Sequence, residues 1–475
     1  NVPVMIMKDL YAAGGIDMSE NILKVDKCLI RAMMVDWMSQ SRQEVASSIM
    51  EKYVMPTEEL SNHMIDLQQQ SKIFSILARF CEEQYKFKSL SEKISKLEKR
   101  VLNKENEIKD LKKQYEKVTV THAEQKQVQQ YYNRLKKQFV SESKDLESLR
   151  KSKQLFSSKA VQYYMKSIIV DDFEEENLDK FFSLWLEQSG NNELNQSLQS
   201  DLLALPSYKL VSWCTQLISR LSNETNNFQI LLKKLIINMC LDHPHHSLYL
   251  LLSLKKHKPN TNEVLNPLLL SRCAAAQAIW DQLLLQDHRY VLGVLLPIDG
   301  FTDQCITLAA YKVSKGKSID LIKFSAGDYW LNELPAIPPP TETIRVDPSK
   351  QYKNVPVLHS IDKKILIATS GLSLPKIANF ILSNGTEHRV LLKHGTDGIR
   401  QDSIMEQVFN KVNNIFAKDR ECNKRGLTIR TYNAVPLGPL SGIIEFVPNS
   451  MAFIDVISGY HQIHDKISYD KAREM

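Results

Sequence analysis

The chain has 475 residues, of which 43% are hydrophobic and 24% are charged, and its formal net charge is +6. This is the composition of a globular protein with about two to four domains. The seven cysteines form no C-x-x-C pair, and the apolar runs fall short of the roughly 18 residues of a spanning helix. A disulfide framework, a zinc ribbon and a membrane partner are therefore not expected.

Glycine and proline are unevenly distributed along the chain. Twelve of the 15 glycines and 11 of the 17 prolines lie after position 292, and no proline occurs between Pro56 and Pro206. Because both residues interrupt helices, the sequence predicts a mainly helical region at 1–334. A proline-rich linker at 335–340 and a small α+β lobe with an antiparallel sheet at 341–475 follow it. The chain begins with Asn1 and no signal-peptide pattern, so we expect a fragment of a larger chain.

Amphipathic helices are predicted early in the chain. Apolar residues recur at spacings of three and four in Lys27–Ser48, Thr57–Phe80 and Leu178–Glu187. Such helices bury one face against their neighbours. Many of them with short connections favour antiparallel pairs, so we expect a helical-repeat shell, although no sequence repeat is visible.

A heptad pattern runs through residues 86–118, with Lys104 in the one place that is not apolar. This stretch has 11 basic and 6 acidic residues, which give +5 of the chain's +6. A second apolar stripe at Val128–Leu149 predicts a long charged hairpin over 86–150, with its turn near Thr119–His122. The hairpin is either a solvated helix pair, which is the commoner role of lysine-rich faces, or an arm that tethers partners or contacts DNA by charge alone.

Three histidines stand close together in Asp242–His246, which reads D-H-P-H-H. Metal sites on helices usually use i, i+4 spacing, and no Cys or carboxylate cluster is paired with these residues. An Asp and a His followed by Pro are typical of a helix start, which we expect here instead of a metal site.

After Pro340 the sequence predicts short strands around one helix at Gln401–Lys418, with a hairpin turn at Asn384-Gly385. The strands are expected at Thr343–Val346, Val357–Ile361, Ile365–Ala368, Lys376–Leu382, Arg389–Leu392, Leu427–Asn433 and Gly442–Val447.

Lys393 ends one of these strands, just before a glycine-containing turn and the helix. A lysine there can present its ammonium to a phosphate as a point charge. The loop Thr369–Ser373 can lay backbone N–H groups and hydroxyls over phosphates. It has one glycine, so these residues alone leave a nucleotide site and an ordinary hairpin both open.

A longer motif around this lysine is recognisable. Lys393–Asp402 reads K-H-G-T-D-G-I-R-Q-D and resembles the K-x-G-x-D-[DG]-[LI]-R-Q-D signature of the phosphatidylinositol 3-kinase-related protein kinases. Leu374–Ile377 looks like their phosphate-loop exit. Thr431–Leu437 and Ser441–Phe446 look like the strand and hinge of their adenine pocket.

Segments of the helical region narrow the resemblance. Ser183–Gly190, Leu205–Lys209 and Asp242–Tyr249 are similar to the FAT domain, the helical shell around the kinase, of the ATM/Tel-type DNA-damage checkpoint kinases. The likeness is clear from Trp185 to Asp455, and residues before it fit only loosely. By this likeness the basic hairpin belongs to the FAT helices.

The resemblance implies a serine/threonine protein kinase that uses ATP and Mg²⁺ and prefers Ser/Thr-Gln sites. It further implies a nuclear protein of DNA repair, checkpoint signalling at double-strand breaks and telomere maintenance. Its expected partners are a nuclease-type sensor complex at DNA ends, the kinase C-lobe of the same protein and a second copy in a homodimer.

The family's nucleotide-binding roles can be carried over by position. Ser370, Gly371 and Leu372 would cover the ATP phosphates, with Pro375 nearby, and Lys393 would contact them. The adenine slot would comprise Tyr432, Ile444, Glu445, Phe446 and Val447. In that slot Phe446 would stack on the base, and the backbones of Glu445 and Val447 would bond to it.

Two departures from the family pattern stand in the signature. Gly398 replaces the second Asp of many members, so Asp397 would hold Lys393 alone in this turn. Some members carry the lysine at the position of His394, but Lys393 has the permanent charge here.

The catalytic loop D-R-H-x-x-N and the Mg²⁺-binding D-F-G do not occur in the chain, and 28 residues follow Val447. We therefore assign no catalytic residue and no metal ligand, and expect the fragment to bind ATP weakly and transfer no phosphate. Two alternatives remain: a non-catalytic scaffold that acts through the heptad helices, and a lipid kinase relative, which would lack the FAT-like segments.

Overall fold

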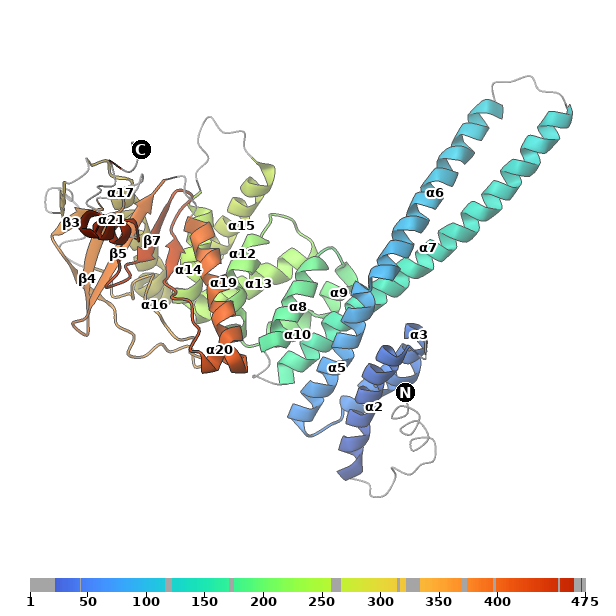
Figure 1. The fold of residues 1–475 in the computed structure, drawn as a ribbon, viewed down its shortest axis with the longest axis horizontal. Coiled ribbons are helices and arrows are strands. Elements are labelled where there is room, and N and C mark those ends of the chain that lie inside the picture. Colours follow the sequence, from blue (N-terminus) through green and yellow to red (C-terminus); the bar gives the residue numbers. More distant parts are fainter. Residues whose placement is uncertain are drawn as a thin grey trace. The chain divides into compact units, whose positions relative to one another are not determined.

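The computed structural model describes residues 22–42, 44–115, 122–170, 175–257, 266–313, 317–321, 334–368, 374–395, 399–451, 453–464 and 471. The chain forms two compact units, Asn1–Leu205 and Pro206–Met475. The first is helical, and the second combines helices with an antiparallel sheet (Figure 1).

The described part of the first unit consists of helices. They are α2 (Ile22–Ser41), α3 (Ala46–Ile49), the π-helical turn η1 (Met50–Val54), α4 (Met55–Ser61), α5 (Leu67–Lys86), α6 (Lys88–Tyr115), α7 (His122–Val170), α8 (Glu175–Glu187), α9 (Asn192–Ser197) and α10 (Gln199–Ala204). The single helix expected at Thr57–Phe80 is wrong. It is divided between α4 and α5, because the Asp66 carboxylate caps α5 by accepting from the Gln69 N–H at 3.1 Å.

The predicted hairpin is present as α6 and α7, which lie side by side along the length of α6 (Figure 1). Ile94, Leu135 and Leu146 are buried in its seam. Lys104, at the polar place of the heptad, forms an ion pair with Glu142 of α7 at 2.8 Å. The expected end of the second helix at Leu149 is wrong, since α7 continues to Val170 and buries Tyr164 in the unit's core.

In the described part of the second unit, six helical elements come before the helical run that packs on the sheet, and the helix start at Pro244 is as expected. They are α11 (Ser207–Leu210), continued by the 3₁₀ turn η2 (Val211–Trp213), α12 (Cys214–Ser219), α13 (Asn227–Asp242), α14 (Pro244–Lys255) and α15 (Pro267–Leu284). α14 contacts α13, α15 and the later strand β6.

One continuous helical run, α16 (His288–Tyr290), η3 (Val291–Leu295) and α17 (Leu296–Ala310), packs on the sheet at β5 and β7. By length and composition alone, it is the one helix in the described part of the chain that could cross a membrane. One face of this run lies in the core: Phe301 is buried and its ring centroid lies 5.9 Å from that of Phe380.

The sheet has the order β1-β3-β4-β5-β7-β6, with β2 also paired to β4, and every pairing is antiparallel. Gly385, at φ +81°, makes the expected hairpin turn between β4 and β5. The strands are β1 (Ile319–Asp320), β2 (Leu358–Ile361), β3 (Lys364–Ile367), β4 (Lys376–Leu382), β5 (Glu387–His394), β6 (Ala434–Pro436) and β7 (Ser441–Glu445).

The helix expected at Gln401–Lys418 is α19 (Ile399–Lys418), followed by α20 (Arg420–Lys424), and α21 (Phe453–His464) comes after β7. Two expected strands are wrong. Thr343–Val346 is irregular, and Leu427–Asn433 is irregular up to the start of β6. In the second case the backbone is held by side chains of α19: Ile429 N–H donates to the Asn413 amide oxygen at 2.7 Å.

The chain divides into its two compact units near Pro206. The domain boundary that the sequence analysis places at 335–340 stays a prediction. The reason for the earlier division is that α14 and α17 pack directly on strands of the lobe. Helices assigned to the shell by sequence thus share one core with the sheet.

Candidate nucleotide-binding site

Lys393 lies on β5, an inner strand between β4 and β7. Its neighbour Leu392 is buried in the core, so alternation along the strand turns the Lys393 side chain to the other face. Its Nζ lies 3.8 Å from the carboxylate of Asp402, which stands in the first turn of α19. A lysine on a strand paired with a carboxylate on the following helix is the arrangement that places an ammonium beside nucleotide phosphates in protein kinases.

Gly442 stands directly opposite Lys393 in the β5–β7 register. A Cβ at this position would lie 2.7 Å from the Ile399 side chain and 2.8 Å from the Val435 carbonyl oxygen. The absent side chain therefore lets the first residue of α19 approach the sheet closely. This contact sets the helix start, and with it Asp402, over Lys393.

His394, the other position where the family can carry the lysine, is bonded differently. Its Nδ1 lies 2.7 Å from the Ser441 hydroxyl. Burial, together with the nearby charge of Lys376, lowers the pKa of His394, so its ring is uncharged at neutral pH. Lys393 is thus the permanent cation at the end of β5.

The predicted hinge residues lie at and just after the end of β7. Glu445 is bonded to Asn433, just before β6, by both its main chain and its side chain: its N–H donates to the Asn433 carbonyl at 2.8 Å, and its carboxylate accepts from the Asn433 N–H at 3.0 Å. Phe446 N–H donates to the Arg389 carbonyl at 3.0 Å, and the Arg389 guanidinium lies 4.4 Å from the Phe446 ring centroid. Within the described residues nothing accepts from the Val447 N–H, which leaves it available to an adenine ring nitrogen.

Tyr432 is placed by a residue that sequence analysis did not identify. Its N–H donates to the buried Glu406 carboxylate of α19 at 3.1 Å. Glu406 lies one helical turn after Asp402, so one helix positions both the partner of Lys393 and the irregular segment before β6 that carries Tyr432. Asp402 could have been recognised, since it is the last residue of the signature and falls in the first helical turn.

The phosphate-covering part of the prediction is only partly visible. Ser370, Gly371, Leu372 and Asp397 lie outside the described residues. Pro375 is described, and its carbonyl accepts from the Ala368 N–H at 2.9 Å, which joins the ends of the loop between β3 and β4. The structure thus brings Pro375, Lys393 and the hinge residues onto one small sheet.

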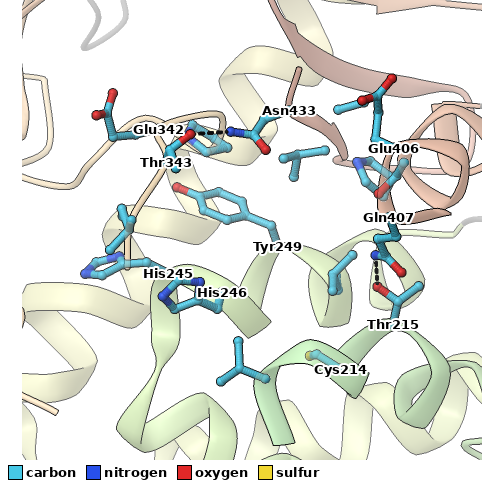
Figure 2. Close-up of a pocket in the computed structure, with 18 of the residues that line it drawn as sticks. Cys214, Thr215, His245, His246, Tyr249, Glu342, Thr343, Glu406, Gln407 and Asn433 are labelled. Atoms are coloured by element: carbon cyan, nitrogen blue, oxygen red, sulfur yellow. Dashed lines mark hydrogen bonds between the residues drawn. The ribbon is translucent and has the colours of Figure 1, made fainter. Parts of the chain in front are cut away.

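A separate cavity of about 290 Å³ lies in the same unit (Figure 2). Of the predicted site residues, Tyr432 alone lines it. The rest of its wall comes from η2, α12, α14, α19, the segment at 340–344 and residues 433–436, which include β6. Lys393 and Asp402 do not line it, so it is distinct from the region around Lys393.

Two parts of the chain match models of known protein families. Residues 388–474 match the family model of phosphatidylinositol 3- and 4-kinases, and residues 193–286 match that of the HEAT repeats of ATR-like serine/threonine kinases. The chain belongs to the phosphatidylinositol 3-kinase-related kinase family.

Members of this family that are similar to this chain include Tel1 kinases. Serine/threonine-protein kinase TEL1 of Candida albicans is 98% identical over all 475 residues, and that of Debaryomyces hansenii is 53% identical over 475 residues. The Saccharomyces cerevisiae TEL1 is 33% identical over 486 aligned positions, which cover 99% of the chain and 17% of that protein. The alignments with these first two relatives include the whole of this chain but only 16% of the length of each relative.

Solved structures of this family share the fold. The open conformation of CtTel1 superposes with a TM-score of 0.82 at 25% identity and covers 99% of this chain, which corresponds to 18% of that one. A Tel1 kinase described as a butterfly symmetric dimer gives 0.77 at 31% identity, with 99% and 20% covered. The expected FAT shell with a kinase N-lobe is therefore confirmed as the fold of this kinase-family chain.

Proposed function

We propose that this chain supplies the ATP-binding lobe and the adjoining helical shell of a serine/threonine protein kinase. The observation that carries the proposal is the placement of Lys393 on β5, opposite Gly442 and 3.8 Å from Asp402 of α19. The relatives' name, serine/threonine-protein kinase, favours protein substrates over the lipid substrates that the family model also includes.

The described residues fit an ATP molecule on chemical grounds. The Lys393 ammonium supplies charge to the phosphates, and Asp402 orients it. The Phe446 ring and the Val447 N–H supply stacking and a hydrogen bond for the adenine. Mg²⁺, when bound, neutralises charge between the β- and γ-phosphates, but the chain contains no D-F-G or D-R-H-x-x-N string to hold it or to accept the substrate's proton.

A measurement of ATP binding tests the proposed role of Lys393 in the lobe. Titration calorimetry should show weak binding to the chain, and Lys393→Met should weaken it by about tenfold or more, since a charge-assisted contact contributes about 1.5–3 kcal/mol. Lys364→Met is the matched control, because Lys364 is an exposed lysine on β3, which β4 separates from the strand of Lys393. Equal binding by the chain and Lys393→Met would contradict the proposed role.

A phosphorylation assay tests whether the chain can transfer phosphate without the catalytic-loop and Mg²⁺-binding motifs. We expect no phosphorylation of a Ser-Gln peptide by the 475-residue chain. Turnover that Lys393→Ala abolishes would show that this chain is catalytically complete and would overturn that part of the proposal.

The alternative of a non-catalytic scaffold rests on the α6–α7 hairpin, whose surface includes exposed Leu102, Tyr131 and Val140. A scaffold should show no ATP-dependent rise in melting temperature, whereas a kinase with an intact pocket should. The natural protein that carries this chain is the right material for that comparison.

The cellular role that we propose rests on the family. It is phosphorylation of Ser/Thr-Gln sites in DNA-break signalling and telomere maintenance, in the nucleus, after recruitment by a DNA-end nuclease complex. Similar Tel1 structures are described as dimers, and we propose a homodimer here too. Loss of break-induced Ser-Gln phosphorylation on Lys393→Met substitution in the natural protein would support this role, and undiminished phosphorylation would contradict it.

A further inference from the structure

The cavity of about 290 Å³ that α12, α14 and α19 help to line has polar groups in its wall, some of them without hydrogen bonds among the described residues. The Tyr249 side chain is 3% exposed, and its hydroxyl has no hydrogen-bond partner among the described residues. His245 Nδ1 and His246 Nε2 are likewise buried and unpartnered within that part of the chain. Figure 2 shows the Tyr249 side chain between the two imidazoles on one side and Thr343 and Asn433 on the other.

Three residues of the cavity wall, Tyr249, His245 and His246, thus each have a buried polar atom without a hydrogen-bond partner among the described residues. A buried polar group that makes no hydrogen bond destabilises the folded protein. Other polar groups in the same wall are satisfied: the Asn433 amide donates to Thr343 Oγ1 at 3.0 Å, and the Gln407 amide donates to Thr215 Oγ1 at 2.9 Å. The unpaired atoms on α14 therefore point to an occupant.

The charge of the wall selects the class of occupant. Glu342 and Glu406 line the cavity, and no lysine or arginine does so among the described residues. One carboxylate oxygen of Glu406 accepts from the Tyr432 N–H, which leaves its other oxygen for a ligand. His388 lies 3.2 Å from Glu342, but burial lowers the pKa of His388, so this imidazole does not cancel the carboxylate charge at neutral pH. Phosphates, carboxylates and nucleotides are disfavoured by such a wall.

Two further features favour an organic cation over a metal ion. No three His, Cys, Asp or Glu side chains in the described part of the chain converge as metal ligands. The wall instead contains the aromatic rings of Tyr249, Tyr432, His245 and His246. Phenol rings attract ammonium groups, and burial lowers the pKa of both histidines to about 4, so their neutral rings can accept hydrogen bonds.

We propose that this cavity is a binding site for a small aliphatic diamine. Its two ammonium groups match the two carboxylates of Glu342 and Glu406, and the Tyr249 hydroxyl and the histidine nitrogens supply the remaining contacts. The cavity volume is near the lower end of the range for small-molecule sites, about 300–1,000 Å³, which suits a short diamine. The site does not depend on the proposed kinase function.

Calorimetric titration of the natural protein with 1,4-diaminobutane, at matched chloride concentration, tests the site. We expect saturable binding with a dissociation constant of about 1 mM or below, which corresponds to about 4 kcal/mol. Glu406→Gln should weaken it about tenfold. No saturable binding up to about 10 mM would mean that the cavity holds water and would overturn the proposal.

Tyr249→Phe separates a ligand contact from a structural role. Because its hydroxyl has no partner among the residues that the structure describes, the substitution should leave the melting temperature of the free protein unchanged or higher, yet weaken diamine binding about fivefold or more. Tyr290→Phe is the matched control, since the Tyr290 hydroxyl donates to the Cys240 carbonyl at 2.8 Å. That variant should lose stability and keep diamine binding.

Three outcomes would count against the site. They are diamine binding that Tyr249→Phe leaves unchanged, equal weakening by Tyr290→Phe, and equally tight binding of inorganic phosphate. The first two would place the diamine elsewhere on the protein, and the third would contradict the cation selectivity.

Discussion

The ammonium of Lys376, at the start of β4, donates a hydrogen bond to the carbonyl of Ala309, at the end of α17. The Lys376 residue is 6% exposed, and burial lowers its pKa. The last carbonyls of a helix have no intrahelical partner and carry partial negative charge, so this lysine satisfies one of them. It also anchors the strand that follows the loop Thr369–Ser373.

Lys376→Met should therefore lower the free energy of unfolding of the second unit by about 1.5–3 kcal/mol, the usual contribution of a hydrogen bond to a charged group. Urea denaturation followed by circular dichroism measures it. Lys364→Met, at an exposed position of the adjacent strand, should change stability by less than about 0.5 kcal/mol. Equal effects of the two substitutions would show that the Ala309 contact adds nothing.

Gly442→Ala should destabilise the lobe by about 1–3 kcal/mol, because the new methyl group would overlap the Ile399 side chain and the Val435 carbonyl. It should also weaken ATP binding, since α19 would be pushed from the sheet and Asp402 with it. Gly300→Ala in α17 is the control: nothing lies within 4 Å of its added Cβ, so alanine should raise stability by up to about 1 kcal/mol. A stable Gly442→Ala variant would show that α19 can shift without cost.

Glu58 in the first unit should dominate the acid sensitivity of that unit. Its carboxylate accepts from Lys159 and Lys166 at 2.8 Å each and from the Tyr163 hydroxyl at 2.6 Å. Burial alone would raise its pKa, but these hydrogen bonds win and lower it to about 2. A lowered carboxylate pKa stabilises the fold above the ordinary value of 4.5, and this contribution is lost as the pH falls towards 2.

Glu58→Gln should cost about 2–4 kcal/mol at pH 7, because two lysines lose their counter-charge, and should flatten the pH dependence between 4.5 and 2. Thermal melts of the parent and variant across that range measure both effects. Glu59→Gln, at the exposed neighbouring position, should melt like the parent. An unchanged acid transition in Glu58→Gln would contradict the prediction.

His245 and His246 should make the second unit sensitive to milder acid. Burial lowers the pKa of each from 6.5 to about 4, and neighbouring histidine charges add to the effect on His246. The unfolded chain then binds protons that the folded chain does not, so stability is full above pH 6.5 and falls as the pH drops towards 4. The steepest loss is about 1.4 kcal/mol per histidine per pH unit.

Urea denaturation at pH 7 and pH 5 measures this loss. His245→Gln should reduce the difference in unfolding free energy between the two pH values, and the remainder comes from His246 and the other histidines of the unit whose pKa burial lowers, His243, His388 and His394. His359→Gln, at an exposed position of β2, should leave the difference unchanged. A pH difference that persists undiminished in a His245→Gln, His246→Gln double variant would assign the acid sensitivity to other groups.

Local signals in the sequence predicted the elements that depend on local chemistry. Asn384-Gly385 identified the β4–β5 turn, and Pro244 identified the start of α14. The heptad pattern identified the α6–α7 hairpin and even its polar position at Lys104, which pairs with Glu142. These features need only neighbours along the chain or one repeating face.

Elements that depend on distant side chains were missed. Leu427–Asn433 has strand-like residues, but Asn413 and Glu406 of α19 bond to its backbone in place of another strand. The extension of α7 to Val170 was missed because its core face changes from a heptad seam to large aromatic residues that pack on other helices.

The site was predictable as far as the signature extends. The motif located Lys393 and the hinge, while the pairing with Asp402 required the close approach at Gly442. The cavity lined by Tyr249 and Glu406 could not be predicted, because its walls are more than 150 positions apart in the sequence and no motif joins them.

Two cations fasten the lobe to the helices before it. Lys376 bonds to Ala309, and the Arg400 guanidinium donates to the Ser253 carbonyl of α14 at 2.9 Å. A transplanted lobe that starts at Pro335 would carry both cations without their acceptors, and a chimera between relatives joined there would pair each cation with a foreign helix end. The exchangeable module of this chain is therefore the piece from Pro206 onwards, and kinase lobes in this family should be swapped together with those helices.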